Sequence, residues 1–200
     1  MKSVTATVLP LALLLASLPL RAQDPAVQEK IRDVSPDKKF AVCVKYDPSI
    51  DDGSSGDISN EAIRSIDVVA MPAKTVVANL LQGGDELASV EGNLIWSSDS
   101  KWFAFAEGEG HRVTTTSVFH WKGDKFEGLD TDQLTVPSGG DARNQYVTPL
   151  RWLKPGTLVL KQFTIFFYEK GESTIEFTAR FDENGKFRVI NRKKVRRKDE

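Results

Sequence analysis

Apolar and polar residues alternate at every second position over much of this chain, which is the period of a β-strand. The clearest case is the segment 174–182, where Ile175, Phe177, Ala179 and Phe181 alternate with polar residues. Such a segment predicts a strand with one face on a core and the other in water. Asn184-Gly185 follows, and this dipeptide is the strongest short signal for a hairpin.

Two further hairpins are predicted by the same reasoning. Residues 117–121 and 125–127 flank a Lys-Gly-Asp turn, and the β-branched run 63–69 resumes at 74–81 after Met-Pro-Ala. No long segment keeps a 3.6-residue apolar period, although 25–32 and 80–88 could form short helical turns. The chain is therefore expected to be all-β.

Two long polar segments interrupt this pattern. Residues 47–60 are rich in Asp, Gly and Ser, and residues 130–144 contain Pro137 and a Gly-Gly pair. Both are expected to be mobile connections.

A short motif recurs along the chain. Ser35-Pro36-Asp37-Lys38 precedes the apolar run 40–44, and Ser97-Ser98-Asp99-Ser100-Lys101 precedes the run 102–106. Asp and Ser side chains can accept backbone N–H bonds across a tight turn, so each motif predicts a bend that leads into a strand. A degenerate third copy has Trp152 in the place of Trp96, with Pro155-Gly156 forming the bend.

With these motifs the chain resembles the TolB-like, WD40-like (PD40-type) β-propeller repeat, whose blades carry a Trp-Ser-Pro-Asp-Gly/Ser-Lys turn before an apolar strand. The resemblance covers about residues 35–190 as three blade-like units. It implies antiparallel blade-like β-sheet repeats, as in a partial or open propeller. It implies little about function, because propellers host many activities.

The chain departs from this family in spacing and in number of units. The two Ser-Asp turns lie 62 residues apart (35 and 97) and the two tryptophans 56 apart (96 and 152), whereas blades run to about 40–45 residues. Three blades are also fewer than the roughly four to eight that close a ring. The chain is thus expected to form an open array or to complete a ring of six as a homodimer. A curled β-sheet or a sandwich is the alternative fold.

The N-terminus has the pattern of a secretory signal peptide. Lys2 precedes a mostly apolar run over 8–20, and Ala22 stands before a polar stretch. The run is too short to span a bilayer, which takes about 20 apolar residues. We assign residues 1–22 to a signal peptide and expect export to a periplasm or to the exterior, without an integral membrane segment.

The remaining residues are enough for one domain, which we place at 23–190. Charge is unevenly distributed, although the whole chain has 27 basic and 28 acidic residues. Residues 186–200 hold eight basic and two acidic residues, whereas 23–185 are acidic. A basic C-terminal tail is therefore assigned to 191–200. Such a tail could bind anionic polymers or membrane surfaces, but a solvated, frayed terminus is the preferred interpretation.

No catalytic, metal-binding or cofactor-binding residue is assigned from the sequence. His111 and His120 lack a zinc-ligand spacing, and Cys43, the single cysteine, lies in an apolar run typical of a core. Four aspartates between 47 and 57 could gather calcium, but their spacing is not that of an EF-hand. The aromatic run 162–168 is expected either to be covered on both faces or to expose a partner site.

These observations predict a non-catalytic exported protein of the cell envelope that binds or scaffolds a protein partner, without nucleic acid. Two alternatives stay open. One is an enzyme with an unrecognised carboxylate site, acting for example on a glycan, and the other is a calcium-dependent adhesion module at residues 47–57.

Overall fold

The computed structural model describes residues 27–51, 58–82, 88–109, 112–131, 134–167, 171–182 and 184–195. This part of the chain is built from strands, with one 3₁₀ turn at Asn60–Ala62. The strands are β1 (Gln28–Arg32), β2 (Phe40–Tyr46), β3 (Ile63–Ala70), β4 (Thr75–Gln82), β5 (Ala88–Trp96), β6 (Trp102–Glu109), β7 (Val113–Trp121), β8 (Phe126–Gly128), β9 (Ala142–Lys154), β10 (Thr157–Phe166), β11 (Glu172–Phe181) and β12 (Phe187–Val195).

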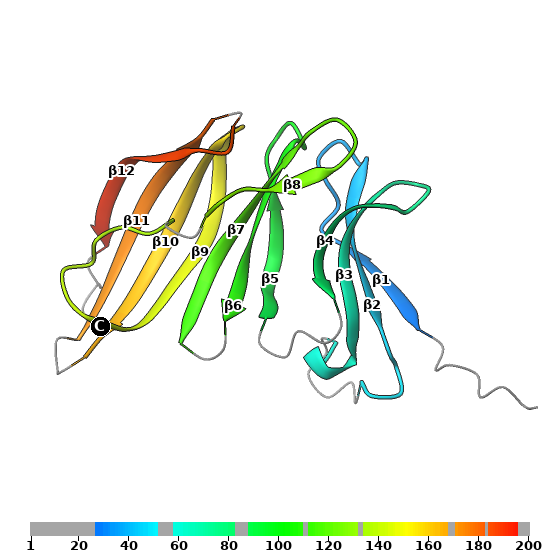
Figure 1. Cartoon of the computed structure of the whole chain (residues 1–200), viewed down its shortest axis with the longest axis horizontal. Coiled ribbons are helices and arrows are strands. Elements are labelled where there is room, and N and C mark those ends of the chain that lie inside the picture. Colours follow the sequence, from blue (N-terminus) through cyan, green and yellow to red (C-terminus); the bar gives the residue numbers. More distant parts are fainter. Residues whose placement is uncertain are drawn as a thin grey trace, which may run out of the picture.

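The strands form three successive antiparallel meanders of four, which we call unit 1 (β1–β4), unit 2 (β5–β8) and unit 3 (β9–β12). Unit 1 is a separate sheet. Units 2 and 3 join through a short parallel pairing of β7 with β9, which makes one larger sheet that curls (Figure 1). The predicted all-β class with antiparallel, blade-like repeats is confirmed.

The three hairpins expected from sequence are present. β3 pairs with β4, β7 with β8 and β11 with β12, all antiparallel. Gly185 in the last turn has a φ of +84°, a conformation that glycine adopts without strain. In β11 the residues expected to face the core are buried, whereas Glu176 and Arg180 between them are not. Local alternation and turn chemistry therefore suffice to define these elements.

The two Ser-Asp turns have the same hydrogen bonds at the same offsets. Ser35 Oγ donates to Asp37 Oδ1 (2.8 Å) and accepts from the Phe40 amide (3.0 Å). In the second turn Ser97 Oγ donates to Asp99 Oδ1 (2.6 Å) and accepts from the Trp102 amide (3.0 Å). Each serine thus ties the turn to the first residue of the next strand, as the repeat predicts.

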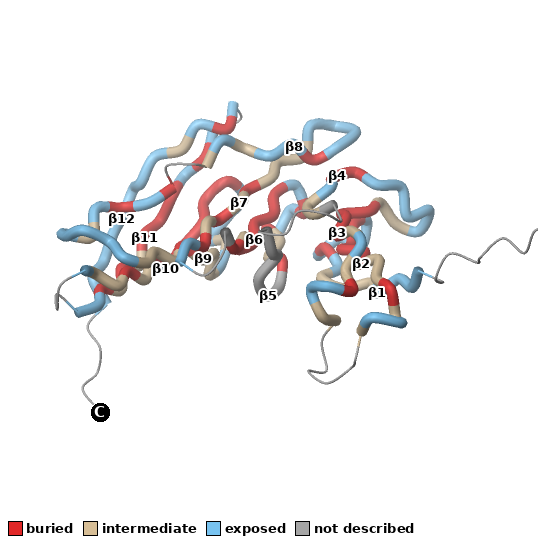
Figure 2. Tube along the Cα trace, turned by 60° about the horizontal axis from the view of Figure 1, so that its bottom comes forward, coloured by how far each residue is buried: buried red, intermediate tan, exposed pale blue. Residues whose placement is uncertain are grey.

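β6 lies between two hydrophobic cores and is buried on both faces. Phe103 and Phe105 pack towards unit 1 with Phe40, whereas Trp102 and Ala104 pack towards unit 3. Figure 2 shows buried backbone running through the middle of the molecule, with the outermost strand β12 exposed. Since large aromatic side chains carry much of the burial energy, these two interfaces hold the three units together.

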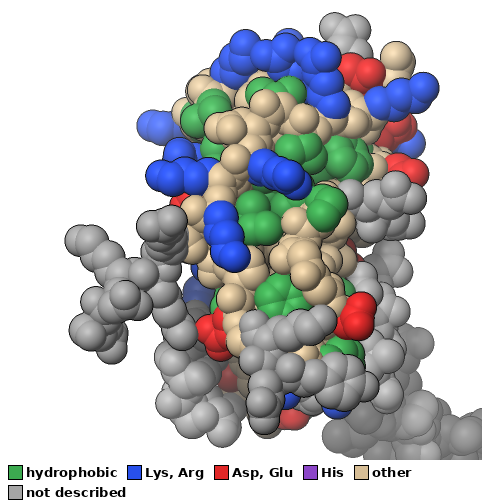
Figure 3. Space-filling model, turned by 90° about the vertical axis from the view of Figure 1, so that its left-hand side faces the viewer, with side chains coloured by type: hydrophobic (Ala, Val, Ile, Leu, Met, Phe, Trp, Pro, Cys, Tyr) green, Lys and Arg blue, Asp and Glu red, His purple; other side chains and the backbone are tan. Residues whose placement is uncertain are grey.

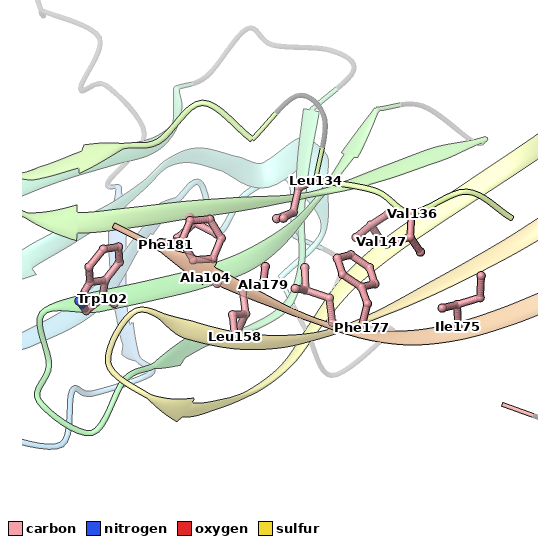
Figure 4. Packing of buried hydrophobic residues seen from close by; sticks show 12 residues of the cluster. Trp102, Ala104, Leu134, Val136, Val147, Leu158, Ile175, Phe177, Ala179 and Phe181 are labelled. Atoms are coloured by element: carbon pink, nitrogen blue, oxygen red, sulfur yellow. The ribbon is translucent and has the colours of Figure 1, made fainter. Parts of the chain in front are cut away.

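The polar segment after β8 differs from the mobile connection expected for residues 130–144. Leu134 and Val136 are buried in the core of the curled sheet, over Val147 and Phe177 (Figure 4). Gln162 of β10, itself fully buried, accepts from the Val136 amide and donates to its carbonyl, both at 2.8 Å. This side chain satisfies the backbone of the crossing segment as a neighbouring strand would. The last residues of the expected loop, from Ala142, belong to β9.

Two other expectations are revised. Residues 28–32 form strand β1 at the edge of unit 1 and not a helical turn, because they pair with β2. β12 continues to Val195, so residues 191–195 of the assigned basic tail are paired with β11 and not frayed. The assigned signal peptide, residues 1–22, lies outside the described residues. Within the described ranges, no helix has the length and apolar character needed to cross a membrane.

Candidate interaction surface

His120 lies in β7 and stacks on Trp102 with ring centroids 3.8 Å apart and an angle of 18° between the planes. The stack places its imidazole against the core of unit 3, which agrees with the packing role expected for it. His111 lies outside the described residues.

Asp47 uses its carboxylate to close the start of the acidic loop. Its Oδ1 accepts from the amide and the hydroxyl of Ser49 (3.0 and 2.6 Å), and its Oδ2 accepts from Arg64 Nη2 (2.9 Å). These hydrogen bonds, first the Ser49 hydroxyl and then the Arg64 guanidinium, lower the pKa of the Asp47 carboxyl below its ordinary value. Asp51 accepts from the Ser59 amide (3.3 Å), and Asp52 and Asp57 lie outside the described residues.

Cys43 is buried in β2, with 1% of its surface exposed, and has no disulfide partner. Burial raises the pKa of its thiol, and the neighbouring Glu29 carboxylate adds to that effect. The thiol is thus a core side chain, as expected from the apolar run around it.

The aromatic run 162–168 keeps strand alternation through β10. Gln162 and Thr164 point into the core and are fully buried, whereas Phe163 is half-buried on the opposite face. There Phe163 stacks with Tyr146 of β9 at a centroid distance of 6.1 Å. Phe167 follows the strand and is 40% exposed. The run is therefore neither wholly covered nor a single exposed patch, and its last residue, Tyr168, lies outside the described residues.

The largest concentration of one charge on the described strands is on β12. Arg188, Arg192, Lys193 and Lys194 are all exposed, and the strand has no acidic residue. None of the four forms an ion pair with another described residue. Figure 3 shows this end of the molecule, where Lys and Arg side chains surround hydrophobic patches. We call these four side chains the cationic edge.

The pairing of β12 with β11 places the cationic edge on both faces of the sheet. Arg192 is opposite Phe177, on the core side, whereas Arg188 is opposite Arg180 on the outer side. Two like charges directly opposite each other disfavour the pairing. The sheet therefore holds a positive charge that its own residues do not neutralise.

The outer edge of β12 is also open, because β12 is the last strand in the order β12-β11-β10-β9-β7-β6-β5 of the described part. The sequence had indicated the basic residues but not this placement. The signal that could have revealed it is the presence of Val189, Ile190 and Val195 among the cations, since β-branched residues favour a strand.

Over the described ranges, no group of three or more His, Cys, Asp or Glu side chains is arranged to hold a metal ion. Comparison of the chain with protein-family models, with curated proteins and with solved structures gives no match.

Proposed function

We propose that this chain is an exported, non-catalytic binding or scaffolding protein of the cell envelope or exterior, which contacts a protein partner through a sheet edge. The proposal includes the resemblance to TolB-like, WD40-like repeats, whose units are commonly used for binding. The observation that carries it is the cationic edge, four positive side chains without ion pairs on an open strand, in a chain whose residues 23–185 have more acidic than basic residues.

Physical reasoning favours an intermolecular role for this strand. Open strand edges invite pairing with other chains, and proteins usually keep such edges short or cover them. β12 is nine residues long and uncovered among the described strands. Complementary charge raises the rate and the selectivity of association, so unpaired cations beside a free edge fit a partner of opposite charge.

The outer face of unit 3 argues against a homodimer in which a second copy of the chain packs on this face. Counted from the residue with positive φ in each turn (Lys38, Ser100 and Gly156), one position of the second strand is Cys43 in unit 1 and Phe105 in unit 2, and both are buried. The corresponding residue in unit 3 is Lys161, which is exposed. A terminal repeat with a polar outer face is what an array needs to stay soluble at its end. We therefore favour a different protein over the homodimer that would complete a ring of six.

Calcium-dependent adhesion and glycan-acting catalysis, the two alternative functions, have less support from the residues that they would require. Calcium-dependent adhesion requires free carboxylates in the loop 47–57, but both oxygens of Asp47 are already occupied by Ser49 and Arg64. A glycan-acting enzyme requires two carboxylates facing each other in a cleft. Asp67, the most deeply buried carboxylate after Asp47 among the described residues, instead accepts hydrogen bonds from Ser65 and Asn79.

The test is chemical cross-linking in the native envelope fraction, with the wild-type chain and with the double variant Arg192→Glu/Lys193→Glu. We expect a stoichiometric protein partner with the wild type and its loss with the variant. Lys30→Glu/Lys101→Glu changes the net charge equally at exposed positions of other units and should retain the partner. If the wild type yields no stoichiometric partner, the proposal fails.

Export is tested separately. The full chain expressed in its native host should be recovered from the envelope or the medium, with a mass that corresponds to removal of about 22 residues. Recovery of the uncleaved chain from the cytoplasm would contradict the proposed localisation.

A further inference from the structure

The backbone of β12 presents a free edge whose charged side chains are all positive. All residues from Arg188 to Val195 are exposed, and no described strand pairs on the outer side. Unpaired N–H and C=O groups along such an edge can form hydrogen bonds with another extended chain. The edge therefore offers main-chain hydrogen bonds in addition to charge.

The arrangement of cations on both faces restricts what such a chain can be. Side chains of an added strand alternate between the two faces of the sheet. On the core side they would meet Arg192 and Lys194, which are opposite Phe177 and Ile175 in β11. On the outer side they would meet Lys193. An extended segment with carboxylates on both of its faces is thus complementary to this edge.

The outer side also contains a repulsive pair that an acidic partner would relieve. Arg180 and Arg188 are directly opposite each other, and neither forms an ion pair with a described residue. Lys193, in contrast, is opposite Glu176. A carboxylate of the partner that extends past the paired segment to Arg188 would gain attraction from both guanidinium groups, and such charge-assisted hydrogen bonds are about twice as strong as neutral ones.

Lysines on an edge strand also protect proteins against unwanted pairing. That effect excludes neutral and basic strands, because their pairing would bury uncompensated cations, but it does not exclude acidic ones. The register shift between β11 and β12 at Ile190 further limits regular pairing to the segment beyond it. The same residues that prevent aggregation can therefore select a partner.

We propose that β12 accepts an acidic extended segment of a partner protein as an added strand, with the segment paired along residues 191–195 and its carboxylates alternating between Arg192/Lys194 and Lys193. This inference rests on the proposed function, since it names the chemistry of the partner. The partner would then be recognised by main-chain hydrogen bonds together with charge, and not by charge alone.

The experiment uses the mature chain and a fluorescent synthetic peptide of ten residues. The peptide repeats two glutamates followed by Thr and Val, so that carboxylates lie on both faces of the strand. Binding is followed by fluorescence anisotropy, and amide hydrogen exchange of β12 is measured with and without the peptide. We expect saturable binding with slower exchange at residues 191–195. Arg192→Glu/Lys193→Glu should weaken binding by at least about tenfold, as removal of close charge pairs does at interfaces. Lys30→Glu/Lys101→Glu should bind as the wild type does.

Three results would overturn the inference. A peptide of equal charge with two internal prolines cannot pair as a strand, so equal affinity for it would show charge attraction alone. Binding of phosphatidylglycerol vesicles through the same two residues, without binding of the peptide, would assign the edge to a membrane surface. Slower exchange outside β12 would place the peptide elsewhere. Far-ultraviolet circular dichroism and urea unfolding verify that each variant folds.

The results distinguish an error in the strand-addition proposal from an error in the proposed binding function. If the peptide does not bind but cross-linking to the native partner still depends on Arg192 and Lys193, the binding function stands and strand addition is wrong. If neither depends on these residues, both fail.

Discussion

The indole Nε1–H of Trp96 donates a hydrogen bond to the backbone carbonyl of Asp33, with 2.7 Å between nitrogen and oxygen. Trp152 repeats this contact at the next junction, where its indole donates to the carbonyl of Ile95 at 3.1 Å. Asp33 and Ile95 are 62 positions apart, as are Ser35 and Ser97. Each tryptophan thus joins its unit to the equivalent backbone position of the unit before it.

Removal of this donor should weaken the junction between units 1 and 2. Trp96→Phe keeps an aromatic ring but leaves the Asp33 carbonyl without its partner, and we expect a loss of about 1–2 kcal/mol in the free energy of unfolding. Urea unfolding measures it. Trp121→Phe removes an indole of similar exposure, for which the structure shows no hydrogen bond, and should cost less. Equal losses in both variants would contradict the role of the Trp96 donor.

The turn serines should be important for stability in the same way. Ser97→Ala leaves the buried Trp102 amide without an acceptor and removes the bond to Asp99, which should cost about 1–3 kcal/mol of unfolding free energy. Ser35→Ala should have a similar effect on the Phe40 amide. The exposed neighbour Ser98→Ala serves as control and should change stability by less than about 0.5 kcal/mol. Thermal or urea unfolding that does not separate Ser97 from Ser98 would contradict this prediction.

Gln162 should hold the crossing segment against the curled sheet. Gln162→Leu leaves the amide and the carbonyl of Val136 unpaired in the core, which should cost about 2–5 kcal/mol. Limited proteolysis should then cut between Leu134 and Asp141 in the variant, and we expect the wild type to resist cleavage there. Lys161→Gln changes the exposed neighbour and should leave both readouts unchanged. A stable, protease-resistant Gln162→Leu variant would show that Leu134 and Val136 suffice to hold the segment.

Asp47 should contribute to acid unfolding. Its pKa is lowered from the ordinary 3.8 by the Ser49 hydroxyl and by Arg64, so the unfolded chain binds the proton more tightly than the folded one. The stabilisation is therefore present above about pH 3.8 and is lost as the pH falls through the lower folded pKa. Urea midpoints measured from pH 7 to below pH 3 should show a shallower acid decline for Asp47→Asn. Ser49→Ala should reduce the decline in part, and an unchanged slope in both variants would contradict the assignment.

The thiol of Cys43 should react only when unit 1 opens. Burial leaves 1% of the residue exposed and raises the pKa of the thiol, so little thiolate is present or accessible at neutral pH. Reaction with a disulfide reagent should be slow in the native protein and fast in urea. A fast native reaction would mean that β2 is accessible. Cys43→Ala gives the background.

Much of the fold could be predicted because the signals were local. Alternation over 174–182 defines β11, Asn184-Gly185 defines the hairpin, and the Ser-Asp turns form through bonds within six residues. The candidate surface could be predicted only in part. The basic residues 192–194 are evident in the sequence, but their place on an open edge depends on the strand order of the whole sheet, in which β12 is the last described strand.

The sequence by itself determined the strands, their hairpins, the repeated turns and the concentration of positive charge near the C-terminus, because each depends on neighbouring residues and on backbone preferences. Only the tertiary structure decided that residues 28–32 extend as β1, that the polar segment 130–144 crosses the core, and that the cations have an uncovered edge. Each of these results from contacts that local patterns do not specify: the pairing of β1 with β2, the hydrogen bonds of Val136 with Gln162, and the strand order that leaves β12 at the end of the described sheet. Burial and hydrogen bonding across such contacts outweigh local propensity.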